Sequence, residues 1–293
     1  MSKQTTVAGP EVTELEDLAR RARAHIVRTI AGAHGGHLGG PLSVIDLLIA
    51  LYFRVLNIRP DEPDWPDRDR CVLSKGHSSI ALYTTLAMRG YFPIEELGTF
   101  DAIDSRLQGH PDMTATPGID MSSGSLGLGF SGALGIAMGA RAAGKDFTTY
   151  AVLGDGECNE GIVWEAAHAA QRYALDNIVA IVDHNKLQQF GWHGDTLDHR
   201  LSPYTGSQLV DRWSAFGWKV FEMDGHDIGD VLATVARARD HVGGPVAVIS
   251  HTIKGKGISF MENNYQWHAR VPTAEELAQA LAELGATPAG GRS

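Results

Sequence analysis

The stretch TYAVLGDGECNEGIVWEAAHAAQRYALDNIVAIVDHNKL, residues 149–187, determines how the rest of the chain is interpreted. It contains an apolar run at 150–153, a glycine-flanked acid at Asp155, a helical pattern at 161–175 and a second apolar run at 178–182. This order predicts a strand, a tight turn, a helix and another strand, which together form one βαβ unit. Its crossover is expected to be right-handed, so the two strands should lie parallel.

The two polar residues that follow these strands are expected to lie side by side. Asp155 follows the first strand and Asn185 the second. The carboxyl ends of neighbouring parallel strands form the edge where open α/β sheets bind ligands. One carboxylate and one amide oxygen suit Mg²⁺, which takes its other ligands from water and phosphate groups. A plain turn and a helix cap would explain the two residues separately, but not their combination.

Composition excludes several classes of function. The chain has 293 residues, 43% of them hydrophobic and 20% charged, as expected of a soluble globular protein. A net charge of −10 without a local basic patch argues against a nucleic-acid partner. Cys71 and Cys158 provide neither a disulfide framework nor a zinc site, and they indicate reduced thiols in the cytoplasm. No segment has the form of a signal peptide or membrane span, so we expect no membrane partner.

The sequence predicts one doubly wound α/β domain, in which helices cover both faces of a mostly parallel sheet. The expected strands are 70–74, 150–153, 178–182, 218–223 and 246–251. The expected helices are 12–31, 41–52, 78–88, 130–143, 161–175, 228–241 and 273–285. Residues 1–10 are expected to be a disordered leader, residues 11–285 the domain and residues 286–293 a flexible tail.

Glycine-rich segments and long loops are the other candidates for functional backbone. Residues 32–40 and 118–139 are glycine-rich, and the second segment opens a helix whose free N–H groups can bind an anion. Residues 104–118 and 188–203 have the composition of loops. Loops of such length within a compact domain usually have a function.

Across residues 12–270 the chain resembles the N-terminal, diphosphate-binding half of transketolase. The motifs that carry the resemblance are GGHLGGPLSVIDL, DRCVLSKGHSSIALY, QGHPD, SGSLGLG, GDGECNEGIVWEA, VDHNKLQ, DGHD and HTIKGKG, in the family's order and spacing. A full transketolase also has a pyrimidine-binding and a C-terminal domain, which have no counterpart in this sequence. The end of the chain is similar to that of the split form, in which a separate subunit carries those two domains.

The resemblance implies a thiamine diphosphate site with Mg²⁺, or with another divalent cation such as Ca²⁺. The implied metal ligands are Asp155, Asn185 and the main-chain carbonyl of Leu187. The implied diphosphate contacts are His77, Gly156 and Asn185, and the rest of the cofactor would lie against Gly124, Ser125 and Leu126. Ser125 departs from the family, which more often has proline at this position.

The resemblance further implies that His37, His110 and His268 face the reacting carbons and that Glu160 and Glu165 lie at a subunit interface. Histidine suits proton transfer near neutral pH, although any one of these residues alone is consistent with an ordinary loop histidine. We assign no role to four others: His34, His184, His193 and His251. Two further lysines, Lys254 and Lys256, have two possible interpretations. They either lie near a phosphate group or are solvated residues of a loop.

The implied function is transfer of a two-carbon ketol unit between sugar phosphates, as in the pentose phosphate pathway. It implies a second, partner subunit in an α₂β₂ assembly and no activity of this chain alone, because in the family a glutamate on the partner domain activates the cofactor. Two alternatives remain open. One is a split relative that acts on a sulfonated or branched sugar, or that catalyses a 1-deoxyxylulose 5-phosphate synthase-like reaction. The other is a non-catalytic regulatory module of the same fold.

Overall fold

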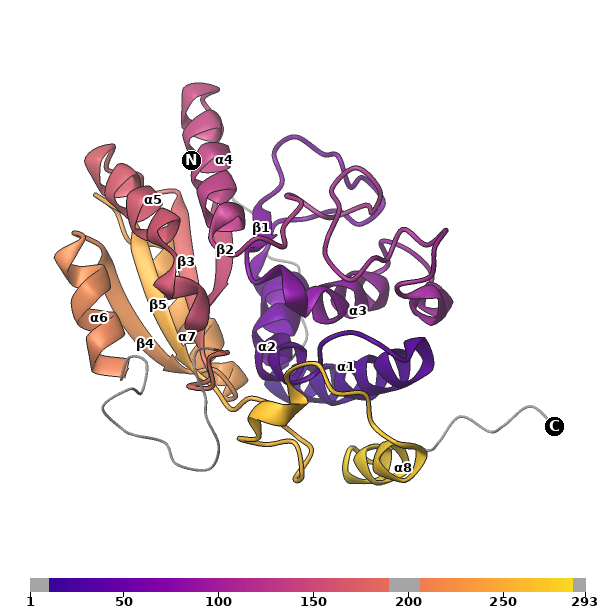
Figure 1. Cartoon of the computed structure of the whole chain (residues 1–293). Coiled ribbons are helices and arrows are strands. Elements are labelled where there is room, and N and C mark those ends of the chain that lie inside the picture. Colours follow the sequence, from indigo (N-terminus) through magenta and orange to yellow (C-terminus); the bar gives the residue numbers. More distant parts are fainter. Residues whose placement is uncertain (1–10, 190–205, 287–293) are drawn as a thin grey trace.

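The computed structural model describes residues 11–189 and 206–286 (Figure 1). The expected leader at 1–10, most of the expected loop at 188–203, His193 and nearly all of the expected tail lie outside these residues. Within them, no helix is both long enough and apolar enough to span a membrane.

The described residues form one five-stranded parallel sheet with the order β1-β2-β3-β5-β4. The strands are β1 (Arg70–Leu73), β2 (Thr149–Gly154), β3 (Ile178–His184), β4 (Lys219–Asp224) and β5 (Val246–His251). All five coincide with expected strands to within two residues at either end. The predicted βαβ unit is present, since β2 and β3 are parallel neighbours with Gly154 opposite Asp183.

Helices cover both faces of the sheet, as the sequence predicts (Figure 1). One face carries α1 (Val12–Ala33), α2 (Gly39–Ala50), α3 (Ser79–Arg89) and α7 (Ile228–Arg239). The other carries α4 (Leu128–Ala142), α5 (Gly161–Arg172) and α6 (Gly206–Ala215). The last helix, α8 (Ala274–Glu283), packs against α1.

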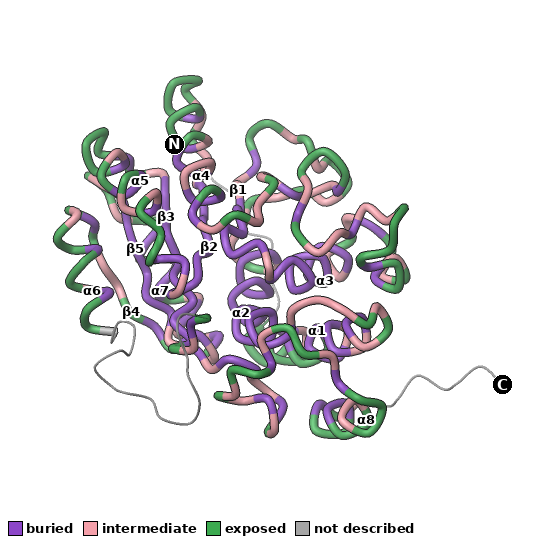
Figure 2. Tube along the Cα trace, viewed as in Figure 1, coloured by how far each residue is buried: buried purple, intermediate pink, exposed green. Residues whose placement is uncertain are grey.

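The apolar core lies on both sides of the sheet because successive side chains of a strand point to opposite faces. In β2, Tyr150 and Val152 belong to the cluster beneath α1, α2 and α7, whereas Ala151 and Leu153 belong to the cluster beneath α4 and α5. Every residue of β2 and β3 is buried, as Figure 2 shows for the centre of the molecule. This two-sided burial explains why both strands are nearly continuous apolar runs.

Three local features differ from the predictions. The helix expected over 161–175 ends at Arg172, and Ala174 follows in the left-handed region with φ 46°. The helix expected over 41–52 begins at Gly39 and continues beyond Ala50 into a π-helical turn, Leu51–Val55. The helix α6 was not predicted, because its ten residues bury only two large side chains one turn apart, Leu209 and Trp213.

The loop expected over 104–118 is confirmed, since no helix or strand lies between Thr99 and Leu128. It is nevertheless tied down, because Leu107 and Thr116 are buried and the Thr116 hydroxyl donates to the Arg106 carbonyl. The loop brings His110 to α3, where the Tyr83 hydroxyl donates to its carbonyl.

Candidate functional site

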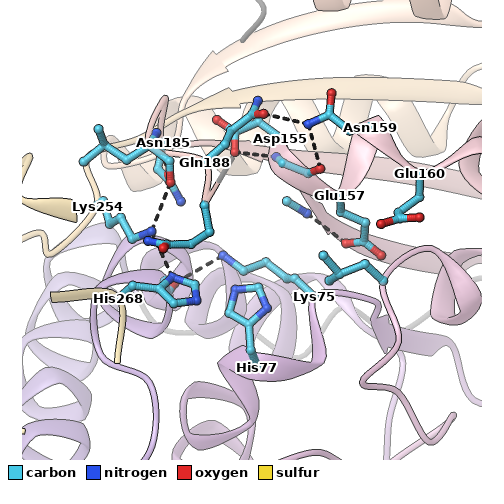
Figure 3. A pocket seen from close by; sticks show the side chains of 16 residues that line it. Lys75, His77, Asp155, Glu157, Asn159, Glu160, Asn185, Gln188, Lys254 and His268 are labelled. Atoms are coloured by element: carbon cyan, nitrogen blue, oxygen red, sulfur yellow. Dashed lines mark hydrogen bonds between the residues drawn. The ribbon is translucent and has the colours of Figure 1, made fainter. Parts of the chain in front are cut away.

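A cavity of about 360 Å³ opens at the carboxyl ends of β1, β2 and β3 (Figure 3). Its wall combines acids, amides, cations and histidines from segments far apart in the sequence. The side chains that matter most for its chemistry are Lys75, His77, Asp155, Asn185, Lys254 and His268. The position is the one that the topology of a parallel sheet predicts for a ligand site.

Asp155 and Asn185 line this cavity together, as the sequence predicts. The backbone N–H of Asp155 donates to the Asp183 carbonyl at 3.2 Å, and its carboxylate accepts from the N–H groups of Gly156 and Lys186, each at 2.7 Å. The side-chain oxygen of Asn185 accepts from the Leu187 N–H at 3.2 Å. The two neighbouring strand ends therefore place the carboxylate and the amide at one edge.

The pKa of Asp155 is raised to about 6, first because the side chain is buried and second because Asp183 is a neighbouring acid. A nearby cation would stabilise the ionised form of this buried carboxyl group. The Asn185 side-chain oxygen and the main-chain carbonyl of Leu187, a residue that also lines the cavity, are the kind of hard oxygen atom that such a cation prefers. The residues present thus fit a Mg²⁺ or Ca²⁺ ion.

The number of ligands restricts which kind of cation site this is. The described part of the chain contains no group of three or more His, Cys, Asp or Glu side chains arranged to hold a metal ion. One carboxylate with two neutral oxygens suits a cation that brings other ligands with it. A diphosphate and water are such ligands.

Positive charge lies beside these oxygens. Lys254 Nζ donates to the Leu187 carbonyl at 3.0 Å and lies 3.0 Å from His268 Nδ1. Its pKa is lowered to about 8, first by burial and then by Lys75. Lys256, by contrast, is not part of the cavity wall, and its ammonium lies 3.8 Å from the Glu262 carboxylate. The structure therefore places Lys254, and not Lys256, within reach of an anion in the cavity.

The four histidines of the predicted motifs gather at one place. The ring centre of His37 lies 5.3 Å from that of His77, 6.3 Å from that of His110 and 5.0 Å from that of His268. Burial is the main cause that lowers the pKa of His37 and of His77, and it lowers that of His268 to about 3, with further contributions from neighbouring histidines and lysines. These three imidazoles are neutral at neutral pH.

The histidines to which we assign no role lie elsewhere. His34 ends α1 and borders a groove against α8. His251 Nε2 lies 2.8 Å from a Glu222 carboxylate oxygen, and its other ring nitrogen lies 3.4 Å from His184 Nδ1. None of the three lines the cavity.

The glycine-rich loop before α4 forms another part of the site. Leu126 lines the cavity, and Gly124 packs so closely on His110 that an added Cβ would lie 3.2 Å from the imidazole. Ser125 is exposed and outside the cavity wall. Glu160 lies at the rim of the cavity at the start of α5, and Glu165 is exposed one turn further along that helix.

Sequence reasoning missed Glu157, a buried acid in the cavity wall. Its carboxylate accepts from the Ser74 hydroxyl, from the Gly127 N–H at 2.7 Å and from the Gly154 N–H at 3.0 Å. It thereby joins the ends of β1 and β2 to the start of α4. Its position two residues after the aspartate of Gly-Asp-Gly carries no signal of this role, because two of its partners, Ser74 and Gly127, come from distant segments.

Sequence reasoning also missed Lys75 and Asp183, a buried ion pair beneath Asn185. The available signal was the charge itself, since Lys75 comes shortly after β1 and Asp183 ends an apolar run within β3. Such residues are rarely buried unless they are paired.

Comparison with known proteins shows the family of the chain. A model of the family described as "Transketolase, thiamine diphosphate binding domain" matches residues 15–291. The chain is 43% identical over 271 residues to the 6-deoxy-6-sulfo-D-fructose transketolase subunit SqwG of Clostridium sp., covering 92% of this chain and 96% of that protein. It is 42% identical over 275 residues to an apulose-4-phosphate transketolase subunit of Phocaeicola vulgatus, covering 94% and 95%.

Among solved structures, transketolase from Campylobacter jejuni matches with a TM-score of 0.86 and 29% sequence identity. The match covers 95% of this chain but 44% of that one, so this chain spans less than half of the solved transketolase. The family match, the identity to the two bacterial subunits and the shared fold all point the same way. The chain belongs to the transketolase family and corresponds to its thiamine diphosphate-binding domain.

Proposed function

We propose that this chain is the thiamine diphosphate- and Mg²⁺-binding subunit of a two-component transketolase. It transfers a two-carbon ketol unit from a ketose phosphate to an aldose phosphate, in the cytoplasm, together with a second subunit. The observation that carries the proposal is the convergence of Asp155, Asn185 and the Leu187 carbonyl in a cavity that also borders His77 and His268. The oxygen atoms suit a metal-bound diphosphate, and the neutral imidazole of His268 suits proton transfer.

Each set of residues has a separate task in this proposal. When bound, thiamine diphosphate supplies a carbon nucleophile for the ketose carbonyl. Asp155, Asn185 and the Leu187 carbonyl hold the cation that neutralises the diphosphate, and the Lys254 ammonium, which contacts that carbonyl, adds positive charge. Gly156 and His77 border the same cavity and contact the diphosphate.

The remaining side chains orient the sugar and move protons. His37, His110 and His268 face the reacting carbons, and the neutral rings of His37 and His268 can each accept a proton at one nitrogen and donate from the other. Gly124, Ser125 and Leu126 lie along the rest of the cofactor. A neutral imidazole suits this task because making or cleaving a bond beside a hydroxyl requires both proton acceptance and donation.

The names of the relatives support a partner subunit. Both bacterial relatives are named as subunits, and this chain covers 96% and 95% of their lengths. The partner would carry the pyrimidine-binding and C-terminal domains, and two copies of each subunit would form an α₂β₂ assembly. Glu160 and Glu165 of α5 would lie at the contact between subunits.

The same names favour a second candidate for the substrate. One relative is named for 6-deoxy-6-sulfo-D-fructose and the other for apulose 4-phosphate. These names favour an unusual ketose over a substrate of the pentose phosphate pathway. The loop over 104–118, which delivers His110, is the described segment in which such a preference would be encoded.

The test compares the chain alone with the chain and a partner from the neighbouring reading frame. Titration calorimetry is expected to show that the pair binds thiamine diphosphate only when Mg²⁺ is present. Two-carbon transfer, measured with pentose, sulfonated and branched sugar phosphates, is expected for the pair and not for the chain alone. Turnover by the purified chain alone would refute the two-subunit proposal. A pair with neither binding heat nor thermal shift would favour a regulatory module.

A further inference from the structure

We propose that the buried Lys75–Asp183 ion pair positions Asn185, by fixing its amide so that the oxygen, and not the NH₂ group, faces the cation. The inference rests on the proposed function, because it concerns one of the metal ligands assigned there. Neither residue of the pair is itself a ligand in that assignment. Both are positioning residues that act through Asn185.

Asp183 is the centre of a hydrogen-bond network beneath the cavity. It is 1% exposed, and its carboxylate accepts from the Ser43 hydroxyl at 2.6 Å and from the Asn185 amide at 3.3 Å. It also accepts from Lys75 Nζ and from the Thr252 hydroxyl. The donors come from α2 and from the ends of β1, β3 and β5, so one carboxylate joins three strand ends and a helix.

This network decides which way the Asn185 amide points. Its Nδ2 lies 3.3 Å from one Asp183 oxygen and 3.4 Å from the Ser43 oxygen, while its Oδ1 accepts from the Leu187 N–H at 3.2 Å. Rotation of the amide by half a turn would place Oδ1 against the carboxylate and Nδ2 against an N–H group. Both contacts would be repulsive, so the observed orientation is the one that the surroundings permit.

Lys75 makes this arrangement possible because it compensates the buried charge of Asp183. Its side chain is 1% exposed, and its ammonium also lies 3.3 Å from the Gly40 carbonyl, which accepts a hydrogen bond from it. An unpaired carboxylate at this depth would be costly. Lys75 borders the cavity in Figure 3, yet its ammonium is directed to Asp183 and Gly40.

The decisive variant is the double substitution Lys75→Met with Asp183→Asn, which removes both charges and leaves none unpaired. An asparagine at 183 can turn either its oxygen or its NH₂ group toward Asn185, so the bias on the Asn185 amide is lost. Changes to residues that orient metal ligands cost about 10–100-fold in metal affinity. We expect a loss of this size in the affinity for thiamine diphosphate with Mg²⁺, measured by calorimetry on the full chain with its partner.

A matched control removes another buried ion pair at the opposite end of β1. Arg68 and Asp120 lie 2.5 Å apart with side chains 11% and 3% exposed, and Asp120 accepts from the Cys71 N–H at 2.7 Å. The double substitution Arg68→Met with Asp120→Asn is expected to lower the melting temperature but to keep the wild-type cofactor affinity. The comparison separates positioning of the ligand from general loss of stability.

A rescue variant tests the orientation itself. Asp183→Asn combined with Asn185→Asp exchanges amide and carboxylate, and a carboxylate at 185 presents an oxygen whichever way it turns. This exchange is expected to recover most of the affinity that Asp183→Asn alone loses. The absence of any recovery would show that the site has collapsed and would overturn the positioning role.

The outcomes separate this inference from the proposed function. If the unsubstituted pair of subunits binds no thiamine diphosphate, the proposed function fails and the inference falls with it. If the wild type binds and the variant Lys75→Met with Asp183→Asn binds equally well, only the positioning role is overturned.

Discussion

At the scale of single residues, Asp155 is the one carboxylate in the proposed ligand set, and its removal is the simplest test of that set. Asp155→Ala is expected to weaken binding of thiamine diphosphate with Mg²⁺ by about 10-fold or more, because the diphosphate charge is then poorly neutralised. The fold should persist, since burial disfavours the charged form of Asp155 and raises its pKa to about 6. Calorimetry and circular dichroism measure the two effects.

His110→Ala is the control for this experiment. The ring centre of His110 lies 6.3 Å from that of His37, and neither residue is a proposed metal ligand or lines the cavity that Asp155 and Asn185 border. The substitution His110→Ala should therefore leave the cofactor affinity unchanged and lower the turnover of the assembled enzyme. Wild-type affinity in Asp155→Ala would show that the metal site has been assigned wrongly.

The sequence predicted Asp155 and Asn185 as neighbours because both positions follow directly from strand ends and chain direction. It could not predict the partners of Glu157 or Asp183, because tertiary packing determines them. Glu157, for example, accepts a hydrogen bond from Gly127, thirty residues away. No periodicity along the chain encodes such a contact. The positions of residues at strand ends can thus be predicted from sequence, whereas the long-range contacts that surround them cannot.

At the scale of elements, Glu157 connects β1, β2 and α4, and its charge is the feature to test. Glu157→Gln keeps the size but turns an NH₂ group toward either the Gly127 N–H or the Gly154 N–H. A buried donor left without an acceptor costs about 1–3 kcal/mol. We expect a decrease of that size in the free energy of unfolding, measured by chemical denaturation, and faster amide exchange at Gly127.

Glu165→Gln, on the exposed side of α5, is the matched substitution and should leave the free energy of unfolding nearly unchanged. If Glu157→Gln is as stable as the wild type, the carboxylate does not hold the glycine-rich loop to the sheet. The loop would then depend on other contacts, such as the hydrogen bond from the Ser123 hydroxyl to the Leu73 carbonyl at 2.7 Å.

The elements themselves were predicted to different degrees. Long apolar patterns located all five strands and the helices with wide apolar faces, because burial against the sheet imposes those patterns. Helix α6 was missed because a ten-residue helix at the edge of the sheet needs only Leu209 and Trp213 as buried anchors. Short helices with few buried positions leave too little periodicity to detect.

At the scale of the whole molecule, the fold class was predictable and the strand order was not. Alternating strands and helices require a parallel sheet with helices on both faces. The placement of β5 between β3 and β4, however, depends on pairing between segments more than sixty residues apart, such as Val179 with Val246. That pairing places Thr252 beside Asp183 and so completes the support of Asn185.

A second buried network joins four parts of the molecule around Asp46 of α2. Arg23 of α1 donates to both of its oxygens, and the protonated Nδ1 of His226 donates to it at 2.7 Å because Nε2 accepts from the Ile253 N–H. Arg23 also donates to the Lys256 carbonyl at 3.0 Å. The network therefore fixes the segment that carries Lys254 relative to α1 and α2.

This network predicts a pH-dependent contribution to the stability of the whole chain. Burial raises the pKa of Asp46, but the Arg23 charge and the hydrogen bonds from His226 and Arg23 outweigh it and hold the pKa below its ordinary value of 3.8. For a carboxyl with a lowered pKa, the stabilisation is complete above pH 3.8 and is lost as the pH falls through the folded-state pKa.

Asp46→Asn leaves Arg23 buried without its partner, which costs about 3–5 kcal/mol at neutral pH. We expect the gap in unfolding free energy between wild type and Asp46→Asn, measured by denaturant titration, to narrow as the pH falls below 3.8. Asp17→Asn, at an exposed ion pair with Arg20, should show almost no gap at any pH. A gap for Asp46→Asn that stays constant in acid would mean that the carboxylate charge is not what stabilises this junction.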